Sequence, residues 1–192
     1  LVGSEMCIRD RRITVSFFNL GGIMFVLTAL VLRFVFVQPS LEYKNFWLIK
    51  SAPVDIFRFF IIKLIVYIPI ILLPGVIMVF VSNVILKVER PMYAVGFLTI
   101  VISSLVLTVS GYSLGILFPK KDYRELTQIE TSFGGLIFVI FSLCYIVLLL
   151  SSLAEPVRKY ILGLTLTFFE LIFYITLFVM INFIYIFSTS YY

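Results

Sequence analysis

Few residues in this chain are of the types that carry out catalysis. The sequence of 192 residues contains no histidine, so the most common general base and metal ligand is missing. The cysteines, Cys7 and Cys144, are far apart and lack the spacing of a metal site. No G-x-x-x-x-G-K-[ST] motif occurs, so the chain cannot hold ATP phosphates with a P-loop. These patterns predict that the chain is not itself an enzyme and holds no metal or other cofactor.

Glu170 is the acidic residue that lies deepest within an apolar stretch. At about 1.5 Å per helical residue, it lies roughly 15 Å from Tyr160, near the middle of a bilayer. Thr167 and Tyr174 share its face by helical spacing. Intramembrane carboxyl groups usually face other helices or a cavity. Two interpretations are therefore open: Glu170 packs against another helix, or it lines a transport route.

Small side chains recur along one face of the stretch 92–118. Ser104, Thr108, Gly111 and Gly115 follow one another at helical spacing. Because small residues let helix backbones approach closely in lipid, helix packing is the favoured interpretation, and a substrate route is the alternative. In the preceding stretch, Asn83 lies near the outer end, where it would bond to a neighbouring helix or a lipid headgroup.

The composition indicates which elements must position these residues. The chain is 62% hydrophobic and 13% charged, whereas soluble domains are about 45–50% apolar and about 25% charged. This excludes a soluble enzyme, a nucleic-acid-binding domain and a disordered chain. We expect an all-α, polytopic membrane protein of about five transmembrane helices, because each span needs about 20 apolar residues. The predicted spans are 14–37, 59–86, 92–118, 132–153 and 160–187.

The distribution of Lys and Arg predicts the orientation of these spans. The two longer connections, 38–58 and 119–131, carry more Lys and Arg with their flanks than the connections on the opposite side. Basic loops face the cytoplasm, so the longer connections should be cytoplasmic and the chain should be multi-pass.

The first eleven residues do not look like part of the natural protein sequence. Residues 6–11, Met-Cys-Ile-Arg-Asp-Arg, can be encoded by codons that resemble a sequencing adaptor. We therefore expect residues 1–11 to be an artefact and residues 12–192 to be the transmembrane domain, a C-terminal fragment of a longer protein.

The first cytoplasmic connection is mixed polar and aromatic. A short helix is predicted within residues 40–54, with Ser40 as its N-cap and Pro53 ending it. Aromatic residues such as Phe46 and Trp47 suit the membrane interface. A plain interfacial helix would explain the segment.

Two stretches resemble permease subunits of ABC exporters of the second type. In residues 41–64, the resemblance rests on an acidic residue, a [ST]-x-P-[VI] turn and a following lysine. In residues 114–138, it rests on the Phe-Pro-basic…Asp…Gln-Ile…Ser-x-Gly-Gly pattern of one exporter subgroup. The matching positions are Glu42, Ser51, Pro53, Val54 and Lys63 in the first stretch, and Phe118, Pro119, Lys120, Asp122, Gln128, Ile129, Ser132, Gly134 and Gly135 in the second.

The resemblance implies a membrane-spanning subunit that couples ATP hydrolysis on a separate ABC-type ATPase to substrate translocation. ATP and Mg would bind that partner, and residues 40–54 would be the coupling helix, with Glu42, Phe46, Trp47, Ser51 and Pro53 facing the ATPase. Membrane lipid would be a further partner, together with either a second permease copy or a missing N-terminal half. No nucleic-acid partner is expected. The location would be a cell membrane, in bacteria the inner membrane.

Two other functions compete with this one. A non-catalytic membrane scaffold fits the composition equally well. A membrane-embedded, lipid-modifying enzyme is disfavoured, because such enzymes need clustered catalytic groups and the spans contain no paired acids.

Overall fold

The computed structural model of this chain describes residues 2–43, 56–87, 90–119 and 127–161. These residues form helices and no strand, which confirms the all-α, polytopic expectation. Four helical stretches are long and apolar enough to cross a membrane. The helices are α1 (Val2–Val31), the π-helix η1 (Leu32–Phe36), α2 (Gln38–Tyr43), α4 (Ile56–Leu86), α5 (Arg90–Leu117), α6 (Thr127–Glu130) and α7 (Phe133–Ile161).

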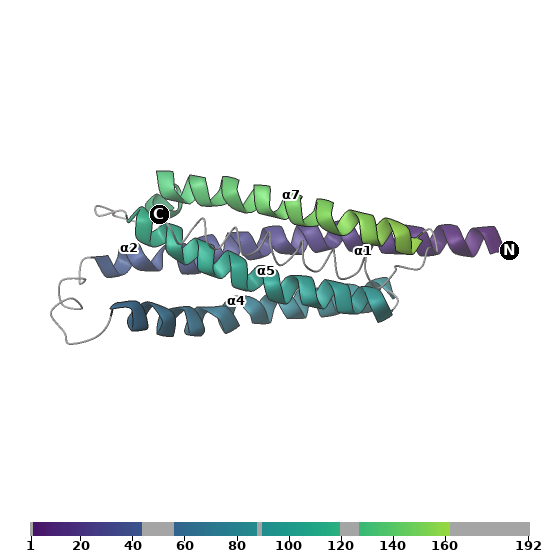
Figure 1. The fold of residues 1–192 in the computed structure, drawn as a ribbon, viewed down its shortest axis with the longest axis horizontal. Coiled ribbons are helices and arrows are strands. Elements are labelled where there is room, and N and C mark those ends of the chain that lie inside the picture. Colours follow the sequence, from purple (N-terminus) through teal and green to yellow (C-terminus); the bar gives the residue numbers. More distant parts are fainter. Residues whose placement is uncertain (1, 44–55, 88–89, 120–126, 162–192) are drawn as a thin grey trace.

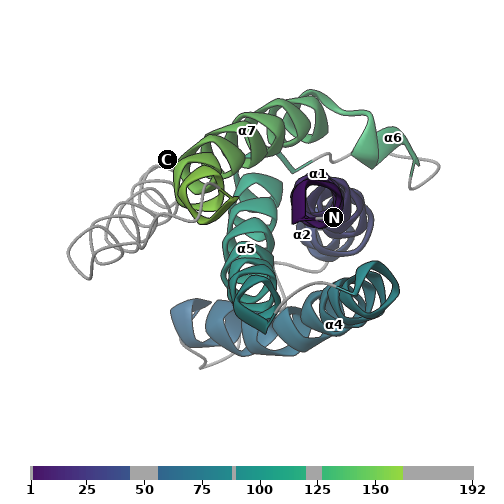
Figure 2. The same ribbon diagram turned by 90° about the vertical axis from the view of Figure 1, so that its right-hand side faces the viewer.

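The long helices run side by side in an elongated bundle (Figure 1). Viewed along the bundle, α1 and α5 lie in the middle, with α4 on one side and α7 on the other (Figure 2). Burial follows this order. About half of the span residues are buried in α1 (50%) and α5 (56%), against 17% in α4 and 28% in α7. The central pair therefore forms the core, and α4 and α7 present most of their surface outward.

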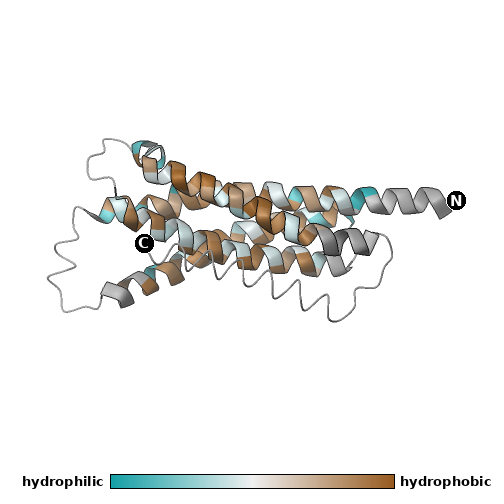
Figure 3. Ribbon diagram, turned by 45° about the horizontal axis from the view of Figure 1, so that its top comes forward, coloured by the Kyte–Doolittle hydropathy of each residue, from teal (hydrophilic) through white to brown (hydrophobic). Residues whose placement is uncertain are grey.

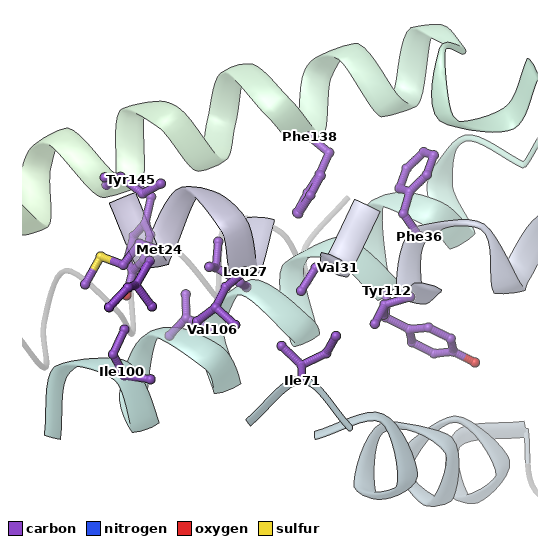
Figure 4. Close-up of a cluster of buried hydrophobic side chains, with 14 of the residues drawn as sticks. Met24, Leu27, Val31, Phe36, Ile71, Ile100, Val106, Tyr112, Phe138 and Tyr145 are labelled. Atoms are coloured by element: carbon purple, nitrogen blue, oxygen red, sulfur yellow. The ribbon is translucent and has the colours of Figure 1, made fainter. Parts of the chain in front are cut away.

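The core is built from one face of α1. Met24, Leu27 and Val31 follow one another at i, i+3 and i+7, a spacing that places side chains on one helical face, and all are fully buried. They point between Tyr145 and Phe138 of α7 and the side chains of α4 and α5 (Figure 4). Gly75 of α4 joins this packing, because an added Cβ would lie 3.0 Å from Ile100 and 3.2 Å from Leu27.

The helices are mostly hydrophobic along their length, with hydrophilic residues near several of their ends (Figure 3). On α4, exposed side chains such as Leu73 (62%) and Phe80 (62%) follow one another without a charged neighbour in the middle of the helix. A water-soluble bundle would place polar residues there. This surface instead suits contact with lipid acyl chains.

Element boundaries differ from the prediction at the start of the first span, where α1 begins at Val2 and not near residue 14, and in two further places. The first span does not end before a separate coupling helix: η1 follows α1 directly, and α2 begins at Gln38, so Ser40 is a buried residue inside α2 and not its N-cap. Pro39 fits in the first turn of α2, where its missing N–H has no partner to lose. The last difference is that α7 continues to Ile161, through the predicted connection after residue 153.

The other boundaries agree more closely. α4 is continuous through Pro69 and Pro74, although each proline removes a backbone hydrogen bond from the helix. Residues 44–54 of the predicted coupling segment and residues 162–187 of the predicted fifth span lie outside the described residues.

We predict that Leu107→Ala destabilises the bundle and that Leu73→Ala does not. Leu107 is fully buried on α5, whereas Leu73 is 62% exposed on α4. Truncation of a buried leucine leaves a cavity and costs about 2 kcal/mol or more, while an outward leucine loses only acyl-chain contact. Unfolding of both variants in detergent, followed by far-UV circular dichroism, measures the difference. Equal destabilisation by the two variants would contradict the placement of α4 at the periphery.

Candidate functional site

The small-residue stripe of α5 lies inside the bundle. Ser104 and Thr108 are fully buried. The Ser104 hydroxyl donates to the Val101 carbonyl at 2.9 Å, and the Thr108 hydroxyl donates to the Ser104 carbonyl at 2.6 Å. Because both hydroxyls are satisfied within their own helix, they can be buried without a polar partner on another helix. The stripe thus presents a smooth, apolar contact surface.

Gly111 and Gly115 are the points of closest approach on this stripe. A Cβ on Gly111 would clash with Val31 of α1 and would lie 3.3 Å from Phe138 of α7. A Cβ on Gly115 would lie 2.6 Å from the carbonyl oxygen of Phe36 in η1. That oxygen belongs to the backbone, so it cannot turn aside as a side chain does. The structure therefore places both glycines where α5 touches the α1–η1 segment.

The residues of the Phe-Pro…Ser-x-Gly-Gly pattern come together where α5 ends and α7 begins. The Ser132 hydroxyl accepts a hydrogen bond from the Gly135 N–H at 3.4 Å, an N-cap contact at the start of α7. A Cβ on Gly134 would lie 2.5 Å from the Cβ of Phe118, and one on Gly135 would clash with the carbonyl of Glu130. These residues shape a tight, close-packed connection.

Of the other residues in that pattern, some are described by the structure and some are not. Gln128 and Ile129 lie in α6, where Ile129 is fully buried, and Pro119 is half-buried just after α5. Lys120 and Asp122 lie outside the described residues.

A salt bridge joins α2 to α4 at the same end of the bundle. Lys63 pairs with Glu42 across 21 residues of sequence, and both side chains are about one-quarter exposed (23% and 27%). The Lys63 ammonium also lies 4.6 Å from the ring centre of Phe59, within the range of a cation–π contact. Glu42, expected to face a partner protein, is thus engaged within this chain.

The remaining predicted site residues cannot be placed, because they lie outside the described residues. These residues are Phe46, Trp47, Ser51 and Pro53 of the coupling segment, and Thr167, Glu170 and Tyr174 of the fifth span.

The structure adds polar contacts between helices that the sequence analysis missed. The Tyr145 hydroxyl donates to Ser103 at 3.4 Å, linking α7 to α5. Asn19 of α1 donates to Ser82 of α4, next to Asn83. A signal existed for the second contact, because Asn19 and Ser82 are polar residues within apolar stretches. Their pairing across 63 residues was not visible in the sequence.

Comparison with known proteins gives one result. A family model described as "Putative ATP-binding cassette" matches residues 4–190. No curated protein and no solved structure matches the chain significantly. The family match keeps the chain in the context of ABC transport.

The same match corrects the resemblance to exporter permeases. By its description the family is of the ATP-binding cassette type, the ATPase side of these systems, and not their permease. On that finding, the expectations of an ABC exporter permease subunit and of its translocation function are wrong. The motifs behind them have a simpler physical role: Ser132, Gly134 and Gly135 cap and close-pack a helix start, a task that arises in any helical membrane chain.

We predict that Gly115→Ala destabilises the bundle by about 1–3 kcal/mol, the usual cost of overpacking a close contact. The added methyl group would meet the Phe36 carbonyl oxygen at 2.6 Å. Gly22→Ala is the matched control, because a Cβ there meets nothing within 4 Å and alanine favours helix. Thermal unfolding in detergent compares the variants. A Gly115→Ala protein as stable as wild type would contradict the close approach of α5 and η1.

We also predict that Glu42 and Lys63 are energetically coupled. A double-mutant cycle with Glu42→Gln and Lys63→Met should give a coupling free energy of up to about 1 kcal/mol, since the pair is partly exposed. Because the Coulomb attraction is screened by salt, the coupling should fall as NaCl is added. Additive effects of the two substitutions at low salt would show that the ion pair contributes nothing.

Proposed function

We propose that this chain, which belongs to the family described as "Putative ATP-binding cassette", is a membrane-embedded component of an ABC transport system. We further propose that it does not hydrolyse ATP itself, because the sequence contains no P-loop motif. The observation that supports the proposal is that the bundle has apolar side chains on its outside and small or hydroxyl-bearing residues on its inside. Large apolar side chains face outward on α4 and α7. Buried serine, threonine and glycine residues of α5 lie inside the bundle. This arrangement is stable in lipid, where small residues and close packing hold helices together.

The helix lengths support the same proposal. Four stretches of 22 to 29 residues meet the apolar length of a membrane span. On this basis we place the chain in a cell membrane as a multi-pass protein, the inner membrane in bacteria. Membrane lipid is then its first partner.

The nucleotide would bind elsewhere in the system. The sequence has no P-loop, and P-loops hold the phosphates of ATP through backbone N–H groups that follow a strand. We therefore assign ATP and Mg to an ABC-type ATPase partner. The role of this chain is that of a membrane scaffold in such an assembly.

The test separates the location of the chain from the location of the nucleotide. We predict that the chain stays in the membrane pellet after extraction with alkaline carbonate, because its apolar spans remain in lipid. Recovery in the soluble fraction would contradict the membrane location.

A second measurement addresses ATP. The complex is purified in mild detergent and irradiated with 8-azido-ATP and Mg, with excess ATP as the competitor. Competable label should appear on a companion chain and be absent from this one. If this chain itself is labelled, and excess ATP prevents that labelling, the chain binds ATP. That result would overturn the non-hydrolytic role and would favour an ATP-binding function, as the family description says.

A further inference from the structure

A mainly apolar pocket that contains four polar side chains lies at the end of the bundle opposite the Glu42–Lys63 salt bridge. It is partly open, has a cavity volume of about 20 Å³, and is formed by α1, α4 and α5 with Leu153 of α7 at its edge. Its polar side chains are Ser16 and Asn19 from α1 and Ser82 and Asn83 from α4. Such a group of polar side chains is unusual inside an otherwise apolar bundle, so each hydrogen-bonding group in it needs a partner.

Most of these groups have one. Asn19 donates to Ser82 through its side-chain amide, and the Ser16 hydroxyl donates to the Asn83 side-chain oxygen at 3.4 Å. The Asn83 amide nitrogen is different: Asn83 is only 5% exposed, and its Nδ2 has no hydrogen-bond acceptor among the described residues. Leaving such a donor unpaired is unfavourable. A ligand with an acceptor oxygen would therefore satisfy the Asn83 amide nitrogen.

The surroundings of Asn83 leave room for that oxygen. Across the pocket, α5 presents Gly96, and even a Cβ built on Gly96 would stay 3.6 Å from the Asn83 amide nitrogen. The amide thus faces a side of the pocket from which a larger side chain is absent.

The charges beyond the pocket specify the ligand further. α1 and α4 run in opposite directions (Figure 1), so Arg12, four residues before Ser16, and Lys87, four residues after Asn83, both extend toward the same end. Both are exposed. At about 1.5 Å per residue, Arg12 lies roughly 6 Å along α1 from Ser16, and Lys87 lies just past the end of α4. Two cations beyond a neutral hydrogen-bond donor favour an anionic ligand with oxygen acceptors.

We propose that this pocket receives one oxygen of the phosphodiester headgroup of an anionic phospholipid, and that the rest of the headgroup lies outside its open side. An ester or phosphate oxygen accepts the hydrogen bond from the Asn83 amide, and the negative charge lies toward Arg12 and Lys87. The position agrees with this, because the pocket lies near the ends of two spans, where a bilayer places its headgroups. The inference rests on the proposed membrane location of the chain.

The test uses the chain of 192 residues, purified in detergent. Native mass spectrometry counts the molecules of dioleoyl phosphatidylglycerol that stay bound, with dioleoyl phosphatidylcholine and inorganic phosphate as comparison probes. Phosphatidylglycerol should be retained preferentially. Asn83→Leu should weaken its binding roughly tenfold, the loss expected for one hydrogen bond to a charged group.

A second variant does not depend on the buried site. Arg12→Gln with Lys87→Gln changes exposed residues only, so the fold should persist while phosphatidylglycerol retention falls. Arg33→Gln is the matched control, since Arg33 is exposed on η1 at the other end of the bundle, and it should leave retention unchanged.

Several outcomes would overturn the inference. Undiminished phosphatidylglycerol retention in both test variants would show that lipid binds elsewhere. Equal retention of phosphatidylcholine would remove the role of charge, and equal competition by inorganic phosphate would indicate a free-anion site. The carbonate extraction is independent of these results, so a chain that stays in the membrane but shows no headgroup preference refutes only this inference.

Discussion

The close contact between α5 and the α1–η1 segment is the constraint on which the rest of the bundle depends. At Gly115 the α5 backbone approaches the Phe36 carbonyl so closely that no side chain fits between them. In lipid, burying apolar surface gives little driving force for helix association, so van der Waals packing at such contacts carries much of it. The close approach of α5 to the α1–η1 segment thus forms the centre against which α4 and α7 pack.

This constraint explains the placement of the polar groups. Hydroxyls near the centre of the bundle, such as those of Ser104, Thr108 and Ser142, donate to carbonyls of their own helices. They add little bulk and need no partner on another helix. Polar contacts between helices lie near the two ends of α4, at Lys63 and at Ser82–Asn83, and between α7 and α5 at Tyr145–Ser103. α4 is thus held by polar contacts at its ends and by the packing of Gly75 between them.

The sequence predicted the helical class because that depends on the length and composition of apolar stretches. Spacing alone also identified the face of α5 that carries Gly111 and Gly115. The partners on that face could not be predicted, because Val31 and Phe36 are ordinary apolar residues in the sequence. Pairing of Glu42 with Lys63 depends on how α2 follows η1, and a π-helix has no clear sequence signal. The family was misjudged for a related reason: turn motifs such as Ser132…Gly135 report local backbone geometry.

The distribution of contacts also indicates which interface can change most easily. Separating α5 from η1 would expose a backbone carbonyl and a row of glycines, with no side chain able to fill the gap. The contacts at the ends of α4 are different, because the ion pair is partly exposed and the asparagine pocket is partly open. Water or headgroup oxygens can replace hydrogen bonds there at modest cost. Within the described residues, α5 thus packs closely against α1 and η1, whereas the polar contacts at the ends of α4 lie where water or headgroup oxygens can replace them.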